Sequence, residues 1–176
     1  MRRVRYNVAA TLDGFIAGPG GEFDWIPEDP TVDFEGLFAR VDTLLIGRRT
    51  YEVMRAQNGP LPWGGTTRAY VFSRTLRPEE HPDVTIVAGD PTATVAALRA
   101  EPGGEIWLFG GGELFAVLLE ARQVDSVEVT VVPVLLGRGV PLLAGGPPRT
   151  TLALKHTQVY PSGMVALHYD VSYPGA

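Results

Sequence analysis

The sequence predicts an α/β fold in which helices cover both faces of a mostly parallel central sheet. Short apolar runs typical of strands alternate with segments of helical periodicity. Glycine and proline, 21 and 15 of the 176 residues, separate these segments at short intervals. The chain ends on two strand-like segments around a Pro-Ser-Gly turn, which predicts an antiparallel hairpin at the sheet edge. With no repeat or linker, residues 1–176 are expected to form one domain.

In the first half of the chain, strands are expected at 4–10, 43–46, 70–73 and 84–87. A helix is expected over 32–41, because Phe34, Leu37, Phe38 and Val41 recur on one helical face. A second, short helix is expected to start at Thr50, a residue type that caps helices, and to run to about residue 56.

In the second half, Asp90 and Pro91 have the pattern of an N-cap followed by a first-turn proline, which predicts a helix to about residue 100. A strand at 106–109 leads into three glycines and a helix to about residue 122. Strands at 127–132, 152–160 and 165–173 complete the sheet.

Four unusual loops follow predicted strands, at 11–30, 47–50, 73–77 and 110–113. Ligands of open α/β sheets bind beyond the carboxyl ends of the strands, so these loops are expected to face one crevice. The 11–30 loop is rich in Gly, Pro and Asp, and a loop of that length in a compact domain is more often functional than passive.

These loops carry the residue types that bind phosphate. Gly110, Gly111 and Gly112 expose bare backbone at a helix start, where free N–H groups favour an anion. Arg48 and Arg49 lie at another helix start, and Ser73 and Arg74 follow a further strand; the planar fork of arginine suits phosphate. Two separate phosphate sites fit a dinucleotide with an additional 2′-phosphate, NADP rather than NAD. The spacing is not the G-x-G-x-x-G of a Rossmann turn. The alternative is that these arginines are solvated surface residues.

Composition excludes several classes of function. The net charge of −5 argues against a nucleic-acid-binding surface, and the absence of cysteine excludes disulfides, thiol catalysis and zinc–thiolate sites. The three histidines, 81, 156 and 168, lack the spacing of metal ligands, so no metal is expected. No apolar stretch of about 18 residues is present to span a bilayer. We expect a cytoplasmic protein that acts on a small molecule, without nucleic-acid or membrane partners.

The chain resembles the dihydrofolate reductase superfamily, and within it the branch containing the reductase domain of riboflavin biosynthesis. The resemblance rests on segments that occur in the family's order over nearly the whole chain: TLDGFIA at 11–17, LIGRRTYE at 45–52, FSR at 72–74, FGGGEL at 109–114 and VVPVLLGRGVPL at 131–142. The last segment is typical of the riboflavin-type branch. The resemblance implies a dihydrofolate reductase-like three-layer fold.

The resemblance also implies an NADPH site and assigns residues to it. The turn at Gly47, Arg48, Arg49 and Thr50 would contact the cofactor phosphates, and Ser73 and Arg74 would lie around the adenosine 2′-phosphate. The glycine turn would receive the pyrophosphate, and the loop after the first strand would cover the nicotinamide. The residues matched in these last two groups are Phe109, Gly110, Gly111, Gly112, Glu113 and Leu114, and Ala9, Ala10 and Ile16.

Three acids are candidates for proton transfer, and each has a structural alternative. Asp13 precedes Gly14 on a loop at a strand end, and the alternative is an Asp-Gly turn. Asp33 lies near the position where dihydrofolate reductases hold the pterin, but only if a short gap is allowed. The alternatives are a residue on the polar face of an amphipathic helix or an acid in the first helical turn. Glu113 either serves catalysis or favours the helix start. Asp13, Trp25 and Asp33 are expected to face the substrate. Trp25 and Trp63 lie in loops where an aromatic ring either stacks on a heterocycle or packs locally.

Two functions follow. The first is an NADPH-dependent reductase of a small heterocycle, either a ribosylaminopyrimidine-like or a pterin-like substrate. The second is a catalytically weak NADP(H)-binding sensor or storage protein. The riboflavin-type relatives further imply a homodimer, with contact expected at the apolar segment 131–143. The alternative is that this segment is an ordinary core strand.

Overall fold

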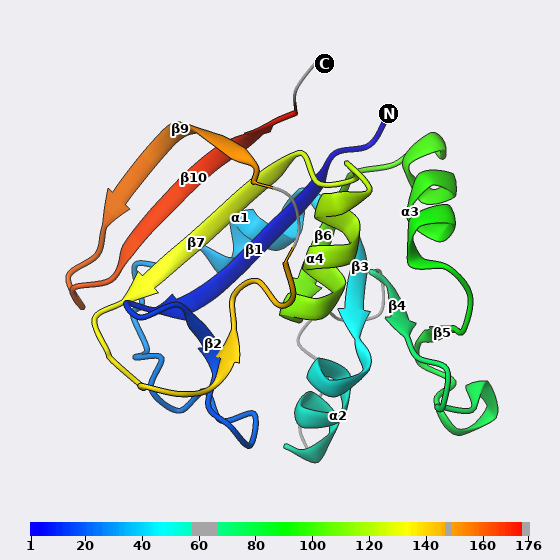
Figure 1. The fold of residues 1–176 in the computed structure, drawn as a ribbon, viewed down its shortest axis with the longest axis horizontal. Helices are drawn as coiled ribbons and strands as arrows, with labels where there is room; N and C mark the ends of the chain where they lie inside the picture. Colours follow the sequence, from blue (N-terminus) through cyan, green and yellow to red (C-terminus); the bar gives the residue numbers. More distant parts are fainter. Residues whose placement is uncertain (58–66, 147–148, 174–176) are drawn as a thin grey trace.

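The computed structural model describes residues 1–57, 67–146 and 149–173. Its centre is an eight-stranded sheet in the order β5-β4-β3-β6-β1-β7-β10-β9 (Figure 1). The strands are β1 (Val4–Thr11), β3 (Val41–Gly47), β4 (Arg68–Phe72), β5 (Thr85–Val87), β6 (Glu105–Gly110), β7 (Ser126–Val132), β9 (Thr151–Val159) and β10 (Val165–Ser172).

The pairing directions match the sequence prediction. The strands from β5 through β7 pair in parallel, whereas β10 pairs antiparallel with both β7 and β9. The mostly parallel sheet with an antiparallel carboxyl-terminal hairpin is therefore confirmed.

Helices cover both faces of the sheet, as predicted. They are α1 (Phe34–Ala39), α2 (Arg48–Ala56), α3 (Pro91–Ala100) and α4 (Gly112–Glu120), with a 3-10 turn, η1 (Pro78–Glu80). One core cluster joins α3 and α4 to β1 and β6 through Leu98, Leu118, Val4 and Ile106, and the second joins α1 and α2 to β3. In Figure 1, α4 crosses in front of the sheet and α1 lies behind it. No helix among the described residues is long and apolar enough to span a membrane.

The start of α3 follows the sequence prediction, and the start of α2 does not. The carboxylate of Asp90 accepts a hydrogen bond from the Thr92 backbone at 2.9 Å, and Pro91 occupies the first turn of α3, as predicted. The structure corrects the start of α2: the helix begins at Arg48 with Gly47 as its N-cap, so Thr50 lies within the first turn instead of capping it.

The predicted helix over 32–41 is shorter than expected. Asp33 is its N-cap, with a carboxylate oxygen 2.8 Å from the Gly36 nitrogen, and the helix ends at Ala39. Val41, predicted on the helical face, is instead buried in β3, where it pairs with Glu105. Over so few residues, an apolar residue at the end of a helix cannot be distinguished by periodicity from one at the start of a buried strand.

Two short strands were not predicted. β2 (Phe15–Ala17) and β8 (Val140–Pro141) form an antiparallel pair outside the main sheet. Neither segment is long enough to be predicted as a strand from its own residues. Each becomes a strand only by pairing with the other, which is distant in sequence. Their pairing connects the loop after β1 to the chain after β7.

Candidate functional site

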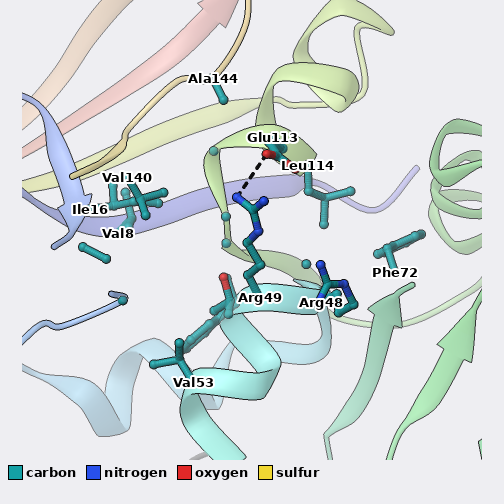
Figure 2. Close-up of a pocket in the computed structure, with 18 of the residues that line it drawn as sticks. Val8, Ile16, Arg48, Arg49, Val53, Phe72, Glu113, Leu114, Val140 and Ala144 are labelled. Carbon is teal, nitrogen blue, oxygen red and sulfur yellow. Dashed lines mark ion pairs between the residues drawn. The ribbon is translucent and has the colours of Figure 1, made fainter. Parts of the chain in front are cut away.

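A cleft of about 1690 Å³ lies at the carboxyl ends of β1, β3, β4, β5 and β6. All four loops predicted to share a crevice contribute to it: the loop after β1, the start of α2, the loop after β4 and the glycine turn after β6. Figure 2 shows Ile16 and Val140 on one side of the cleft and Arg48 and Phe72 on the other.

The start of α2 supplies two arginines to the cleft. Arg48 forms an ion pair with Glu52, one turn along the same helix, at 2.8 Å. Arg49 points across to α4, where its guanidinium lies 3.5 Å from the Glu113 carboxylate (Figure 2). Both side chains of this second pair are about three-quarters exposed, at 75% and 77%. Exposed ion pairs contribute only about 0–1 kcal/mol, so a phosphate can displace Glu113 from Arg49 with little loss of stability.

The loop after β4 presents a further arginine. Ser73 is buried, and its hydroxyl accepts hydrogen bonds from the backbone nitrogens of Thr75 and Leu76 at 3.2 and 3.0 Å. These bonds shape the loop on which Arg74 is exposed at the cleft. Within the described ranges, the Arg74 guanidinium has neither a hydrogen bond nor an ion pair. Ser73 therefore organises the loop, and Arg74 is the group available to a ligand.

The glycine turn brings bare backbone close to two neighbouring segments. Only Gly110 has a positive φ, at +150°, so conformational freedom explains one of the three glycines. A Cβ at Gly112 would lie 2.4 Å from the Pro141 carbonyl oxygen, and one at Gly111 would lie 3.2 Å from the Thr50 hydroxyl. The other two glycines thus permit close packing of the α4 start against residue 141 and α2. The first turn of α4, which carries Glu113, opens into the cleft.

Asp13 joins the loop after β1 to the chain after β7. Its carboxylate accepts hydrogen bonds from the Thr11 hydroxyl at 2.5 Å and from the backbone nitrogens of Leu136 and Gly137 at 3.0 and 2.7 Å. The bond from Thr11, with those from Gly137 and Leu136, lowers the pKa of Asp13 below its ordinary value. The side chain does not line the cleft. Asp13 thus holds two loops together as an ionised group.

One end of the cleft is apolar. Phe34 and Leu37 of α1 line it together with Trp107 and Phe109 of β6. The Trp107 ring is buried, and its nitrogen donates to the Asn7 carbonyl at 2.9 Å, so this tryptophan belongs to both the core and the cleft. An apolar end with aromatic side chains suits a flat heterocycle.

Almost all residues that the sequence assigned to the cofactor line the cleft. Those that line it are Ala9, Ile16, Gly47, Arg48, Arg49, Thr50, Ser73, Arg74, Phe109, Gly110, Gly111, Gly112, Glu113 and Leu114. Ala10 does not, because it is 2% exposed and packs in the core.

The residues expected to face the substrate lie elsewhere. Asp33 caps α1, and Trp25 donates from its ring nitrogen to the Glu22 carbonyl at 3.1 Å; neither lines the cleft. Asp13 is occupied as described above. Trp63 lies outside the described residues. In each described case, the polar group of the side chain already forms hydrogen bonds within the protein, and those of Asp13 include bonds from residues 136 and 137.

Several polar residues that line the cleft were not predicted, Asn7 and Arg138 among them. Asn7 lies on β1, within a run that reads as buried strand, so nothing in its sequence context marks it. Arg138 lies in the Gly137-Arg138-Gly139 loop, where the flanking glycines were a signal that it borders a ligand site. In the part of the chain that the structure describes, no group of three or more acidic or histidine side chains is placed so that it could hold a metal ion.

Comparison with known proteins identifies the family of the chain. The RibD C-terminal domain family matches residues 2–166. The uncharacterized protein YyaP of Bacillus subtilis is 32% identical over 179 residues, covering 96% of this chain and 94% of its own.

Two solved structures are similar in fold. A putative riboflavin biosynthesis protein from Shewanella sp. PV-4 has a TM-score of 0.84 at 26% identity, covering 98% of this chain and all of its own. Dihydrofolate reductase from Enterococcus faecalis, complexed with NADP(H) and RAB-propyl, has a TM-score of 0.70 at 18% identity, covering 97% of both chains. The expected dihydrofolate reductase-like fold is confirmed, and the chain belongs to the RibD C-terminal domain family.

Proposed function

We propose that this chain is a single-domain NADPH-dependent reductase that transfers a hydride to a small heterocycle of the pyrimidine or pterin type. One observation carries the proposal: a single cleft has arginines and an open helix start at one end and aromatic side chains at the other. The chain belongs to the RibD C-terminal domain family, and one structural neighbour is a dihydrofolate reductase complexed with NADP(H).

The cationic end suits the phosphates of NADPH. Arg74, without a partner among the described residues, would receive the 2′-phosphate, and Arg49 would exchange its exposed pairing with Glu113 for the pyrophosphate. The first turn of α4 adds backbone N–H groups and the positive end of the helix. The cleft volume exceeds the roughly 300–1,000 Å³ of a typical ligand pocket, as a dinucleotide and a second molecule require.

When bound, the reduced nicotinamide supplies the hydride. The chain's own residues hold the substrate and orient it. Ile16 and Val140, on the paired strands β2 and β8, cover one side of the cleft. Phe34, Leu37 and Trp107 enclose the apolar end, where a flat ring would be fixed against the cofactor.

The proton source follows from the positions of the three candidate acids. Glu113 lines the cleft, but at the cationic end and paired with Arg49. Asp13 has a lowered pKa and Asp33 caps a helix, so both are poorly suited to donate a proton. We therefore propose that solvent at the cleft delivers the proton. Asp13 would instead hold in position the paired strands β2 and β8, which cover one side of the cleft.

An open cleft favours an enzyme over the alternative, a weak NADP(H) sensor. A sensor needs only the cationic end, and nothing would then maintain the aromatic end as open space. The aromatic end is lined instead by Phe34, which is 59% exposed, and by half-buried Leu37. Unfilled apolar surface of this kind is typical of a binding site.

The test is a parallel titration with NADPH and NADH, read by tryptophan quenching. We expect wild-type protein to prefer NADPH by about tenfold or more, equivalent to about 1.4 kcal/mol. Arg74→Ala should remove this preference, whereas Arg77→Ala, an exposed arginine of the same loop that does not line the cleft, should keep it. Equal binding of the two nucleotides, or no binding at millimolar concentration, would reject the cofactor assignment.

We also propose that the protein is a homodimer through segment 131–143. Leu135 of this segment is 70% exposed and Leu12 beside it is 66% exposed. The backbone nitrogen of Leu12 donates to the Val134 carbonyl at 3.0 Å, so the two leucines lie on adjoining segments. Together they form an apolar surface that a second copy would cover.

A further inference from the structure

Asn7 is a polar side chain of the cleft that the phosphate chemistry does not use. It lies on β1, opposite Glu128 of β7 in the parallel register, and it lines the cleft with Trp107 of the neighbouring strand β6. Trp107 contacts Phe38 of α1, with ring centroids 5.3 Å apart, so Asn7 belongs to the α1 side of the sheet, where the apolar end of the cleft lies. The amide is therefore positioned where a substrate ring would bind.

A buried ion pair fixes one end of this amide. The Asn7 Nδ2 nitrogen donates to a Glu128 carboxylate oxygen at 2.9 Å. Glu128 is 8% exposed, and its other oxygen lies 3.2 Å from Nε of Arg5, which is itself 5% exposed. Arg5 also contacts Glu105. A carboxylate paired with arginine only accepts hydrogen bonds, so it must face the amide nitrogen and not the amide oxygen.

The other end of the amide is available to a ligand. Among the described residues, no group donates a hydrogen bond to Asn7 Oδ1. The one buried side-chain oxygen or nitrogen without a partner in these same residues is Ser162 Oγ, so Asn7 Oδ1 is not a buried unpaired atom. The half-buried Asn7 side chain thus exposes an acceptor, and the space that it borders is the cleft.

We propose that Asn7 Oδ1 is a specificity-determining acceptor that selects substrates with an amino group or ring N–H at this position, and that Glu128 is the positioning residue that sets the amide orientation. The proposal rests on the proposed function, because it concerns the substrate end of the same cleft. It narrows the substrate class to heterocycles that donate a hydrogen bond here. A ring carbonyl at the same position would meet a second acceptor and leave both unpaired, which disfavours binding.

The test compares two pyrimidines of nearly equal shape, with NADPH saturating. 2,4-Diaminopyrimidine carries N–H donors, and 2,4-dimethylpyrimidine replaces each amino group by a methyl group. We expect wild-type protein to bind the diamino compound about tenfold more tightly, as one neutral hydrogen bond allows. Asn7→Leu, of similar size and without an acceptor, should bring the ratio close to one. Gln57→Leu removes an amide from another part of the cleft lining and should leave the ratio unchanged.

Glu128→Gln tests the positioning role. A glutamine at 128 can still accept from Arg5 and can donate to Asn7, which lets the amide turn and present nitrogen to the cleft. The ratio should then fall although Asn7 is intact. A residue that merely supported the fold would weaken both pyrimidines equally and leave the ratio as in wild type.

NADPH affinity separates the outcomes. If wild-type protein does not bind NADPH, the proposed function fails. Two results would overturn the role of Asn7 while the reductase proposal stands. In the first, wild-type protein binds NADPH but does not prefer the diamino compound to the dimethyl compound. In the second, Asn7→Leu keeps that preference. Asn7→Ala replaces the leucine variant if the latter no longer binds NADPH, and a preference retained there overturns the proposal equally.

Discussion

Replacing Gly112 by alanine tests whether the start of α4 must pack closely against segment 140–144, which includes strand β8 beside the cleft. The new Cβ would lie 2.4 Å from the Pro141 carbonyl oxygen and 3.1 Å from that of Leu142. Both neighbours are backbone atoms, so no side chain can rotate away, and either α4 or segment 140–144 must shift. Overpacking of this kind costs about 1–3 kcal/mol.

Part of this loss is offset in the unfolded chain. Alanine has less backbone freedom than glycine when unfolded, which stabilises the folded state by about 0.4–1 kcal/mol. Because both contacts are with backbone atoms, the overpacking cost lies in the upper half of its range. The net destabilisation for Gly112→Ala is therefore about 1–2.5 kcal/mol, or a Tm lowered by about 2–10 °C for a chain of this size. Gly89→Ala is the matched control, because Gly89 also lines the cleft, but a Cβ there meets nothing within 4 Å.

The assay is urea unfolding together with the NADPH titration. Residues 140–141 form β8, which pairs with β2, so a displaced segment should move Ile16 and weaken NADPH binding as well as stability. Gly89→Ala should be as stable as wild type or slightly more so. If Gly112→Ala unfolds at the wild-type urea midpoint and binds NADPH equally, segment 140–144 does not pack against α4 as described.

Two further predictions concern the hydrogen bonds of Asp13 and the oligomeric state. Asp13→Asn should be less stable than wild type at neutral pH, because the folded pKa lies below the unfolded value of about 3.9 and the ionised carboxylate accepts its hydrogen bonds best. This difference should persist above the unfolded pKa and vanish as the pH falls through the folded pKa; a difference in urea midpoint that grew towards pH 3 would contradict the assignment. In sedimentation velocity, wild-type protein should be a dimer and Leu135→Asp a monomer, whereas Leu154→Asp, on the exposed edge strand β9, should remain a dimer. The opposite pattern would move the interface to β9.

The pattern of elements was predictable from the sequence because it depends on local chemistry. Apolar runs bounded by glycine and proline predicted the main strands, and Asp90 with Pro91 predicted the start of α3. Arg49, Arg74 and the glycine turn could be assigned to one crevice because parallel strands bring their carboxyl ends to the same edge of a sheet. These inferences need only the residue types and their order.

The use of each polar group was decided by the tertiary structure. Asp13 and Asp33 have the chemistry of catalytic acids, but their carboxylate oxygens already accept hydrogen bonds from backbone N–H groups of the protein. Asn7 has no distinctive sequence context, and it becomes a candidate only because Glu128, more than a hundred residues away, turns its amide. Hydrogen-bond partners distant in sequence determine which polar atoms remain available, and only the folded chain brings them together.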